Sequence, residues 1–143
     1  MSRDELIEAF ATFPARLAGA AKARVAEWRP IPDGEWGPNE VVRHLIAVET
    51  EVHQARLADL ATQDAPTWEW AEPGPWPGEP ELSLDALLDR FAGLRAATRA
   101  TLDTLDAAGW ARTGTHTRLG MWDVEALVRN AVEHDAEHLA GLA

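Results

Sequence analysis

Apolar residues recur at intervals of three and four in four stretches of the chain, a pattern typical of amphipathic α-helices. The first stretch covers residues 3–28, and Pro14 within it is expected to kink the helix or delay its start. The second covers residues 38–62, with a proline at its first helical position. The third covers residues 83–106, and the fourth begins at residue 121 or 122. We therefore expect four long helices.

Residues 64–82 break this pattern. They include five prolines, which exclude regular structure, and three tryptophans, Trp68, Trp70 and Trp76. Loops of this length are usually functional or disordered, so we consider either a hydrophobic flap or a lid beside an active site. With one long crossover between helices two and three and no convincing strand, the chain predicts an all-α four-helix bundle. We expect residues 1–143 to form a single domain.

The composition narrows the function further. The net charge is −11 without any block of basic residues, which argues against nucleic-acid binding and against adhesion to anionic membranes. No apolar run reaches the length of a membrane span and the start lacks a signal-peptide pattern, so a cytoplasmic location is expected. The chain has no cysteine, so any sulfur chemistry requires a thiol from outside.

Three histidines lie on the apolar stripes of their helices. His134 and His138 are four residues apart on one face of the last helix, and His44 falls in the stripe of the second. Three neutral imidazoles on facing helices suit a first-row metal and leave a coordination position open, as in catalytic sites. The alternative is that they are hydrogen-bonded core residues. His53, nine residues after His44, is expected on the opposite, solvated face.

Other polar residues are weaker candidates. Glu51 and Glu137 are the carboxylates best placed to orient a histidine or to act on bound water. Arg43 and Arg129 are candidates for binding an anionic substrate, although nothing separates them from ordinary surface charges. The histidine pair is similar to the zincin motif, but Asp135 stands where zincins have the glutamate that activates water, so we set that interpretation aside.

The sequence resembles the DinB/YfiT family of bacterial metal-binding four-helix bundles. The resemblance rests on residues 36–45, WGPNEVVRHL, and on residues 120–139, which end in HDAEHL. Members of the family carry a histidine in helix two and an H-x-x-x-H pair in helix four, which match the three histidines above. Gly37 departs from the serine that is common in the family, a change that weakens a helix cap and not the site.

The resemblance implies an up-down-down-up order of helices, a homodimer, and Ni, Zn, Mn or Fe held by His44, His134 and His138. Some relatives depend on low-molecular-weight thiols, among them mycothiol-dependent maleylpyruvate isomerase and S-transferases that use mycothiol or bacillithiol. We therefore expect a metal-dependent enzyme that acts on a small molecule, either a thiol S-transferase or a hydrolase. The alternative is a non-catalytic stress-response module whose loop tryptophans form a dimer interface.

Overall fold

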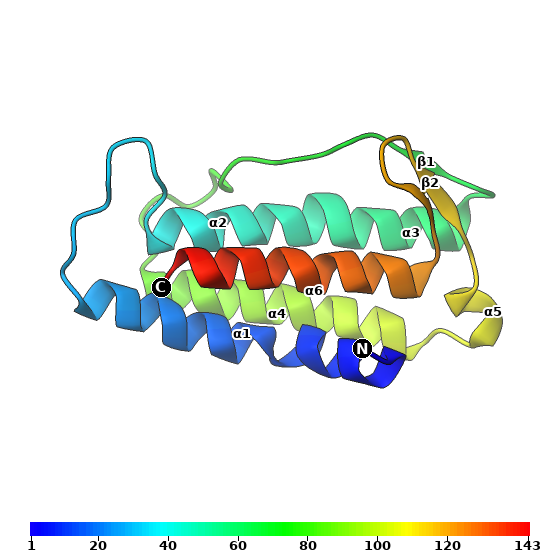
Figure 1. Ribbon diagram of the computed structural model, residues 1–143, viewed down its shortest axis with the longest axis horizontal. Coiled ribbons are helices and arrows are strands. Elements are labelled where there is room, and N and C mark those ends of the chain that lie inside the picture. Colours follow the sequence, from blue (N-terminus) through cyan, green and yellow to red (C-terminus); the bar gives the residue numbers. More distant parts are fainter.

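The computed structural model describes all 143 residues, and four long helical segments lie side by side in a bundle (Figure 1). The segments are α1 (Arg3–Ala26), then α2 (Pro38–Val48) continued by the π-helical η1 (Glu49–Gln54) and by α3 (Ala55–Thr62), then α4 (Leu84–Asp103), and last α6 (Val124–Gly141). α1 and α6 run in one direction, and α2–α3 and α4 run in the other (Figure 1). The predicted all-α four-helix class and its up-down-down-up order are confirmed.

The helix starts follow from their capping residues. Ser2 forms a capping box with Glu5, which fixes the start of α1 at Arg3, so Pro14 does not delay it and the helix continues through that residue. The Asp123 side chain accepts a hydrogen bond from the Ala126 amide and starts α6, two or three residues later than the apolar pattern indicated.

A small three-stranded sheet closes one end of the bundle, contrary to the expectation of no strand. It consists of β1 (Thr67–Trp68), β2 (Gly114–His116) and β3 (Gly120–Trp122); β1 is parallel to β2, and β2 is antiparallel to β3. The Trp68 ring packs so closely on Gly114 that a Cβ there would come within 2.5 Å of the ring. The glycine therefore lets this part of the crossover pair with β2. A short helix, α5 (Ala107–Trp110), also forms where the sequence indicated only a helix end.

The π-helical segment η1 changes which residues of the second helix face inward. A π-helix bonds residue i to i+5, so each residue rotates the chain less than in an α-helix. From this segment onward the α-helical extrapolation from His44 fails: His53, inside η1, is buried and 3% exposed, whereas Ala55, the first residue of α3, is exposed. The prediction of a solvated His53 is therefore wrong.

A buried ion-pair network joins three of the four long helical segments through Arg95. Arg95 on α4 is 1% exposed and donates through Nε to Glu49 Oε1 (3.0 Å) and through Nη1 and Nη2 to the Asp135 carboxylate (2.8 and 3.1 Å). Thr98 donates to the other oxygen of Glu49 at 2.8 Å. Both carboxylates are almost completely buried. Each charge in the network thus has a charged partner, which a buried charge requires.

The same arginine completes the hydrogen bonding of α1. Pro14 has no N–H, so the carbonyl of Phe10, four residues earlier, lacks its helical donor. Arg95 Nη1 donates to that carbonyl at 2.9 Å, and its guanidinium lies 3.9 Å from the centroid of the Phe10 ring. The proline in α1 and the arginine in α4 are therefore complementary.

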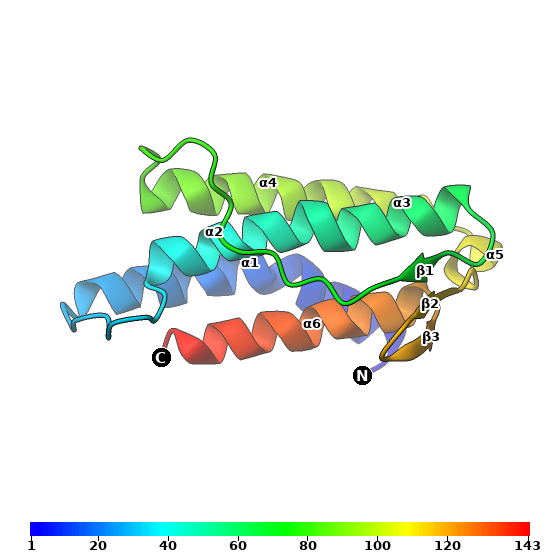
Figure 2. The same cartoon turned by 90° about the horizontal axis from the view of Figure 1, so that it is seen from above.

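Apolar side chains fill the bundle on either side of this network. Phe10 and Trp68 belong to a cluster toward the sheet, and Phe13 and Phe91 belong to a second cluster toward the other end. The crossover from α3 to α4 returns along the bundle between α2 and α6 (Figure 2). None of the helices combines the length and apolar composition that a membrane span requires.

Candidate metal centre

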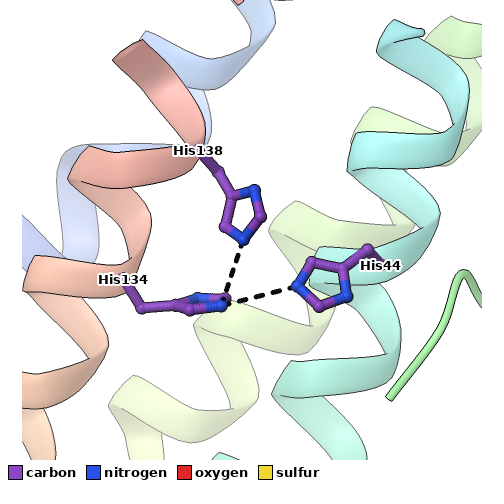
Figure 3. A group of neighbouring side chains, drawn as sticks. All are labelled: His44, His134 and His138. Atoms are coloured by element: carbon purple, nitrogen blue, oxygen red, sulfur yellow. Dashed lines mark hydrogen bonds between the residues drawn. The ribbon is translucent and has the colours of Figure 1, made fainter. Parts of the chain in front are cut away.

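Three histidine rings from α2 and α6 converge in the bundle beneath the crossover (Figure 3). His134 Nε2 lies 3.4 Å from His44 Nε2 and 3.1 Å from His138 Nε2, and these nitrogen atoms all lie within 4.8 Å of one another. His44 is buried and the other two are half-buried. The structure therefore brings together the three residues that the sequence singled out.

Two of the three separations between these nitrogens match those around a single metal ion. Zinc binds imidazole nitrogen at about 2.0–2.1 Å, so ligands around one ion in tetrahedral or octahedral geometry lie roughly 2.9–3.4 Å apart. The two short separations, 3.1 and 3.4 Å, fall in this range. The donor set is all nitrogen, which suits the borderline metals that the resemblance implies.

Two further observations are consistent with metal binding by these rings. His44 Nδ1 donates to the Pro73 carbonyl at 2.7 Å, which leaves the lone pair of Nε2 directed at the other rings. Burial lowers the pKa of all three imidazoles, and for His134 burial together with the neighbouring histidines lowers the pKa to about 3. The rings are therefore neutral at neutral pH, which is the form that binds a metal.

A cavity of about 160 Å³ lies next to the centre and includes His44 and His134 in its wall. The crossover supplies part of this wall through Trp70 and Glu72. Of the two carboxylates that the sequence offered, Glu137 is exposed and lines the cavity, whereas Glu51 is exposed and does not line it. Since Glu51 lies inside η1, the altered rotation of that segment accounts for the difference.

The three tryptophans of the crossover have different surroundings. Trp68 is buried and donates through Nε1 to Asp59, so it belongs to the core and not to an exposed interface. Trp70 is 49% exposed and lines the cavity, which agrees with a pocket wall. Trp76 is half-buried, and Arg90 lies 4.1 Å from its ring. The crossover is therefore both a flap over the bundle and a wall of the cavity.

The arginines that the sequence offered as anion ligands have other partners. Arg43 donates to the carbonyls of Trp76, Gly78 and Glu79 and so holds the crossover in place. Arg129 lies 3.5 Å from Glu125 one turn away on the same helix. Neither lines the cavity.

His53, Arg56 and His116 are all buried and line the cavity together with His44 and His134. Sequence reasoning missed His53 and Arg56, and it noted His116 only as a connector residue that could approach the site. The rotation caused by η1 carries His53 and Arg56 inward, and His116 is placed by strand β2. No apolar periodicity in the sequence signals either effect.

The chain matches the model of the DinB superfamily over residues 2–142. It therefore belongs to the DinB superfamily, as the resemblance indicated. Among solved structures it is similar to YfiT from Bacillus subtilis, at 21% sequence identity and a TM-score of 0.75, covering 99% of this chain and 86% of YfiT.

YfiT is described as "a probable metal-dependent hydrolase with an unusual four-helix bundle topology", and at this identity the likeness shows the shared fold. No protein of curated function matches the chain. The superfamily, the fold and the three-histidine group fit a metal-dependent enzyme.

Proposed function

We propose that this protein is a divalent-metal-dependent hydrolase of small molecules, with His44, His134 and His138 as the metal ligands. The observation that carries this proposal is the convergence of three neutral imidazoles beside a cavity that two of them, His44 and His134, line. Three protein ligands leave a further coordination position for water or substrate, which distinguishes catalytic zinc sites from closed structural ones.

The residues around the centre have separable tasks. A bound divalent ion supplies Lewis acidity and lowers the pKa of water. His44 is held in the required tautomer by the Pro73 carbonyl, and the exposed carboxylates of Glu133 and Glu137 line the cavity, where one can accept a proton from water. Trp70 and the adjoining crossover limit the volume open to solvent beside the rings.

Thiol-dependent S-transfer is the second candidate, supported by the same ligand set together with the absence of cysteine from the chain. Three neutral ligands leave the positive charge of a divalent ion intact, which favours a thiolate at neutral pH. The sulfur then comes from mycothiol or bacillithiol. The protein's part is the same as in hydrolysis, but the cavity receives the sulfhydryl group and the electrophile together.

A non-catalytic stress-response dimer is the third candidate, in which the histidines serve only the core. If this candidate is correct, loss of a histidine or of the metal lowers stability and changes no reaction. The homodimer implied by the resemblance remains a prediction for all three candidates, and sedimentation equilibrium tests it.

The first experiment is metal analysis by mass spectrometry on the untagged protein and on His44→Ala and His138→Ala. We expect a stoichiometric first-row metal in the parent and none in either variant. His116→Gln is the matched control, because it removes a cavity histidine outside the ligand set and should retain the metal. A parent that contains no metal and takes none up contradicts the proposal.

The second experiment distinguishes the two candidate enzymatic activities, hydrolysis and S-transfer. p-Nitrophenyl acetate hydrolysis and conjugation of bacillithiol or mycothiol to monochlorobimane are measured with parent and His138→Ala. Metal-dependent hydrolysis alone supports the hydrolase, conjugation alone supports the transferase, and a metal-bound parent inactive in both assays favours the non-catalytic module.

A further inference from the structure

Arg56 is a buried cation without a carboxylate partner. It is 7% exposed, and its only hydrogen bond runs from Nη2 to the Glu69 carbonyl at 3.3 Å. Its guanidinium lies 5.6 Å and 5.7 Å from the ring centroids of Trp68 and Trp122, which favour a cation but leave most of its N–H groups unpaired. Burial lowers the pKa of Arg56, consistent with a missing counter-charge. This arginine lines the cavity beside the three histidines.

His116 offers a second donor to the same cavity. Its Nδ1 accepts hydrogen bonds from the backbone N–H groups of Arg118 (3.0 Å) and Leu119 (3.1 Å), so the ring proton resides on Nε2. The Nε2–H group has no protein partner, and it is not among the polar atoms sealed from solvent. The turn between β2 and β3 therefore fixes this imidazole as a donor.

His53 completes this end of the cavity. Its Nε2 is enclosed and has no hydrogen-bond partner in the protein, and its ring centroid lies 6.5 Å from that of His134 in the wall of the same cavity. The acidic residues of the cavity wall, Glu72, Glu133 and Glu137, are all exposed. Positive charge and fixed donors are thus buried, and negative charge faces solvent.

We propose that Arg56 and His116 form a subsite for a carboxylate group of the substrate, beside the three-histidine centre. A planar guanidinium and an imidazole N–H match the oxygens of a carboxylate, and such charge-assisted hydrogen bonds are strong in a buried site. The subsite rests on the proposed function because it names the substrate class: small molecules that carry a carboxylate a short distance from the reacting bond. A cavity of about 160 Å³ admits only a compact molecule of this kind.

The test measures binding and needs no turnover. Propionate and its neutral isostere propionamide are titrated into the protein, with the His116 imidazole signals followed by NMR. We expect propionate to bind about 10- to 100-fold more tightly than propionamide, the range of one or two charge-assisted hydrogen bonds. Equal binding of the two, or tighter binding of inorganic phosphate than of propionate, overturns the carboxylate assignment.

Two variants and one matched control locate the site. Arg56→Gln should abolish the preference for propionate and His116→Phe should weaken it, whereas Arg118→Gln removes an equal charge just outside the cavity and should keep it. Retention of the full preference in Arg56→Gln overturns the proposal. If Arg56→Gln does not fold, the ratio of the propionate and propionamide affinities of the parent still tests whether the protein prefers a carboxylate.

Because carboxylates also bind metals, the titration is repeated in His138→Ala, which lacks a metal ligand. Preference that persists there assigns binding to Arg56 and His116, and preference lost there overturns the subsite. A parent that has no metal but prefers propionate contradicts only the proposed enzyme. A metal-bound parent without the preference contradicts only the subsite.

Discussion

Three arginines are buried in this protein, and two of them, Arg95 and Arg56, have opposite surroundings. Arg95 lies at the centre of the four helices and contacts two buried carboxylates and a backbone carbonyl. Arg56 lies against tryptophans at the cavity and has one carbonyl as its hydrogen-bond partner. Both sites remove a cation from bulk water, but only the first supplies compensating charge from the protein itself.

The difference in partners indicates different roles for the two arginines, one in stability and one in ligand binding. A satisfied buried ion network resists disruption, because removing one member leaves the others uncompensated. A buried cation without a charged partner in the protein is stabilised by any anion that binds to it, so its contribution to stability depends on whether a ligand is bound. We therefore assign Arg95 to the stability of the bundle and Arg56 to substrate recognition.

Loss of Arg95 should have the largest effect on stability. Arg95→Met leaves Glu49 and Asp135 buried without a cation, and we expect the free energy of unfolding to fall by about 3–5 kcal/mol. Urea denaturation measures this change. Arg99→Met, on the same helix with an exposed partner in Asp103, is the control and should cost less than about 1 kcal/mol. Similar losses in both variants contradict the assignment.

Loss of a candidate ligand should affect metal binding far more than folding. We expect His138→Ala to weaken binding of Zn or Ni by more than the roughly 10- to 100-fold that removal of an outer-shell partner costs. Isothermal titration calorimetry on metal-free protein gives the affinity, and its thermal unfolding gives the stability. If His138→Ala binds metal as His116→Gln does, the ligand assignment is wrong.

Removal of Arg56 should leave stability nearly unchanged in the absence of ligand. The loss of the cation–π contacts destabilises the fold, whereas removal of a buried charge without a charged partner stabilises it, so the two effects oppose each other. We expect Arg56→Gln to lie within about 1.5 kcal/mol of the parent in urea denaturation. A loss as large as that of Arg95→Met would show that both arginines are structural.

The smallest expected effect is a change in the titration of His116. Burial, and then the charges of Arg56 and Arg118, lower the pKa of His116 below its ordinary value of 6.5. Its contribution to stability is therefore present above pH 6.5 and is lost as the pH falls below that value. Arg56→Gln should raise the pKa of His116, measured from its ring proton signals by NMR. An unchanged midpoint would mean that the two groups do not interact.

Hydrophobic periodicity predicted the four helices and placed His44, His134 and His138 on their inward stripes, and the family resemblance grouped the three as one site. These features depend on local spacing within regular α-helices, which a sequence reports directly. The end of the second helical segment at Thr62 agrees with the structure for the same reason. The small sheet was missed because its strands are two or three residues long and pair across distant parts of the chain.

The charged network was not predicted, because the inward-facing positions of each helix were identified from apolar residues alone. Arg95 lies four residues after Phe91 and three before Thr98, so it occupies a core position of α4. Asp135, adjacent to a candidate ligand, was considered only as a replaced catalytic acid. A charged residue at core spacing in one helix signals that another helix carries its opposite charge.

The π-helical segment η1 lies between His44 and the cavity residues His53 and Arg56, so a change in its length would move the second group without moving the first. Deletion of one residue from Glu49–Gln54 would turn all that follows by about 100° relative to His44. His53 and Arg56 would leave the cavity, whereas His44 would keep its place opposite α6. A single insertion or deletion in this segment would therefore change the residues that line the cavity without changing the three candidate metal ligands.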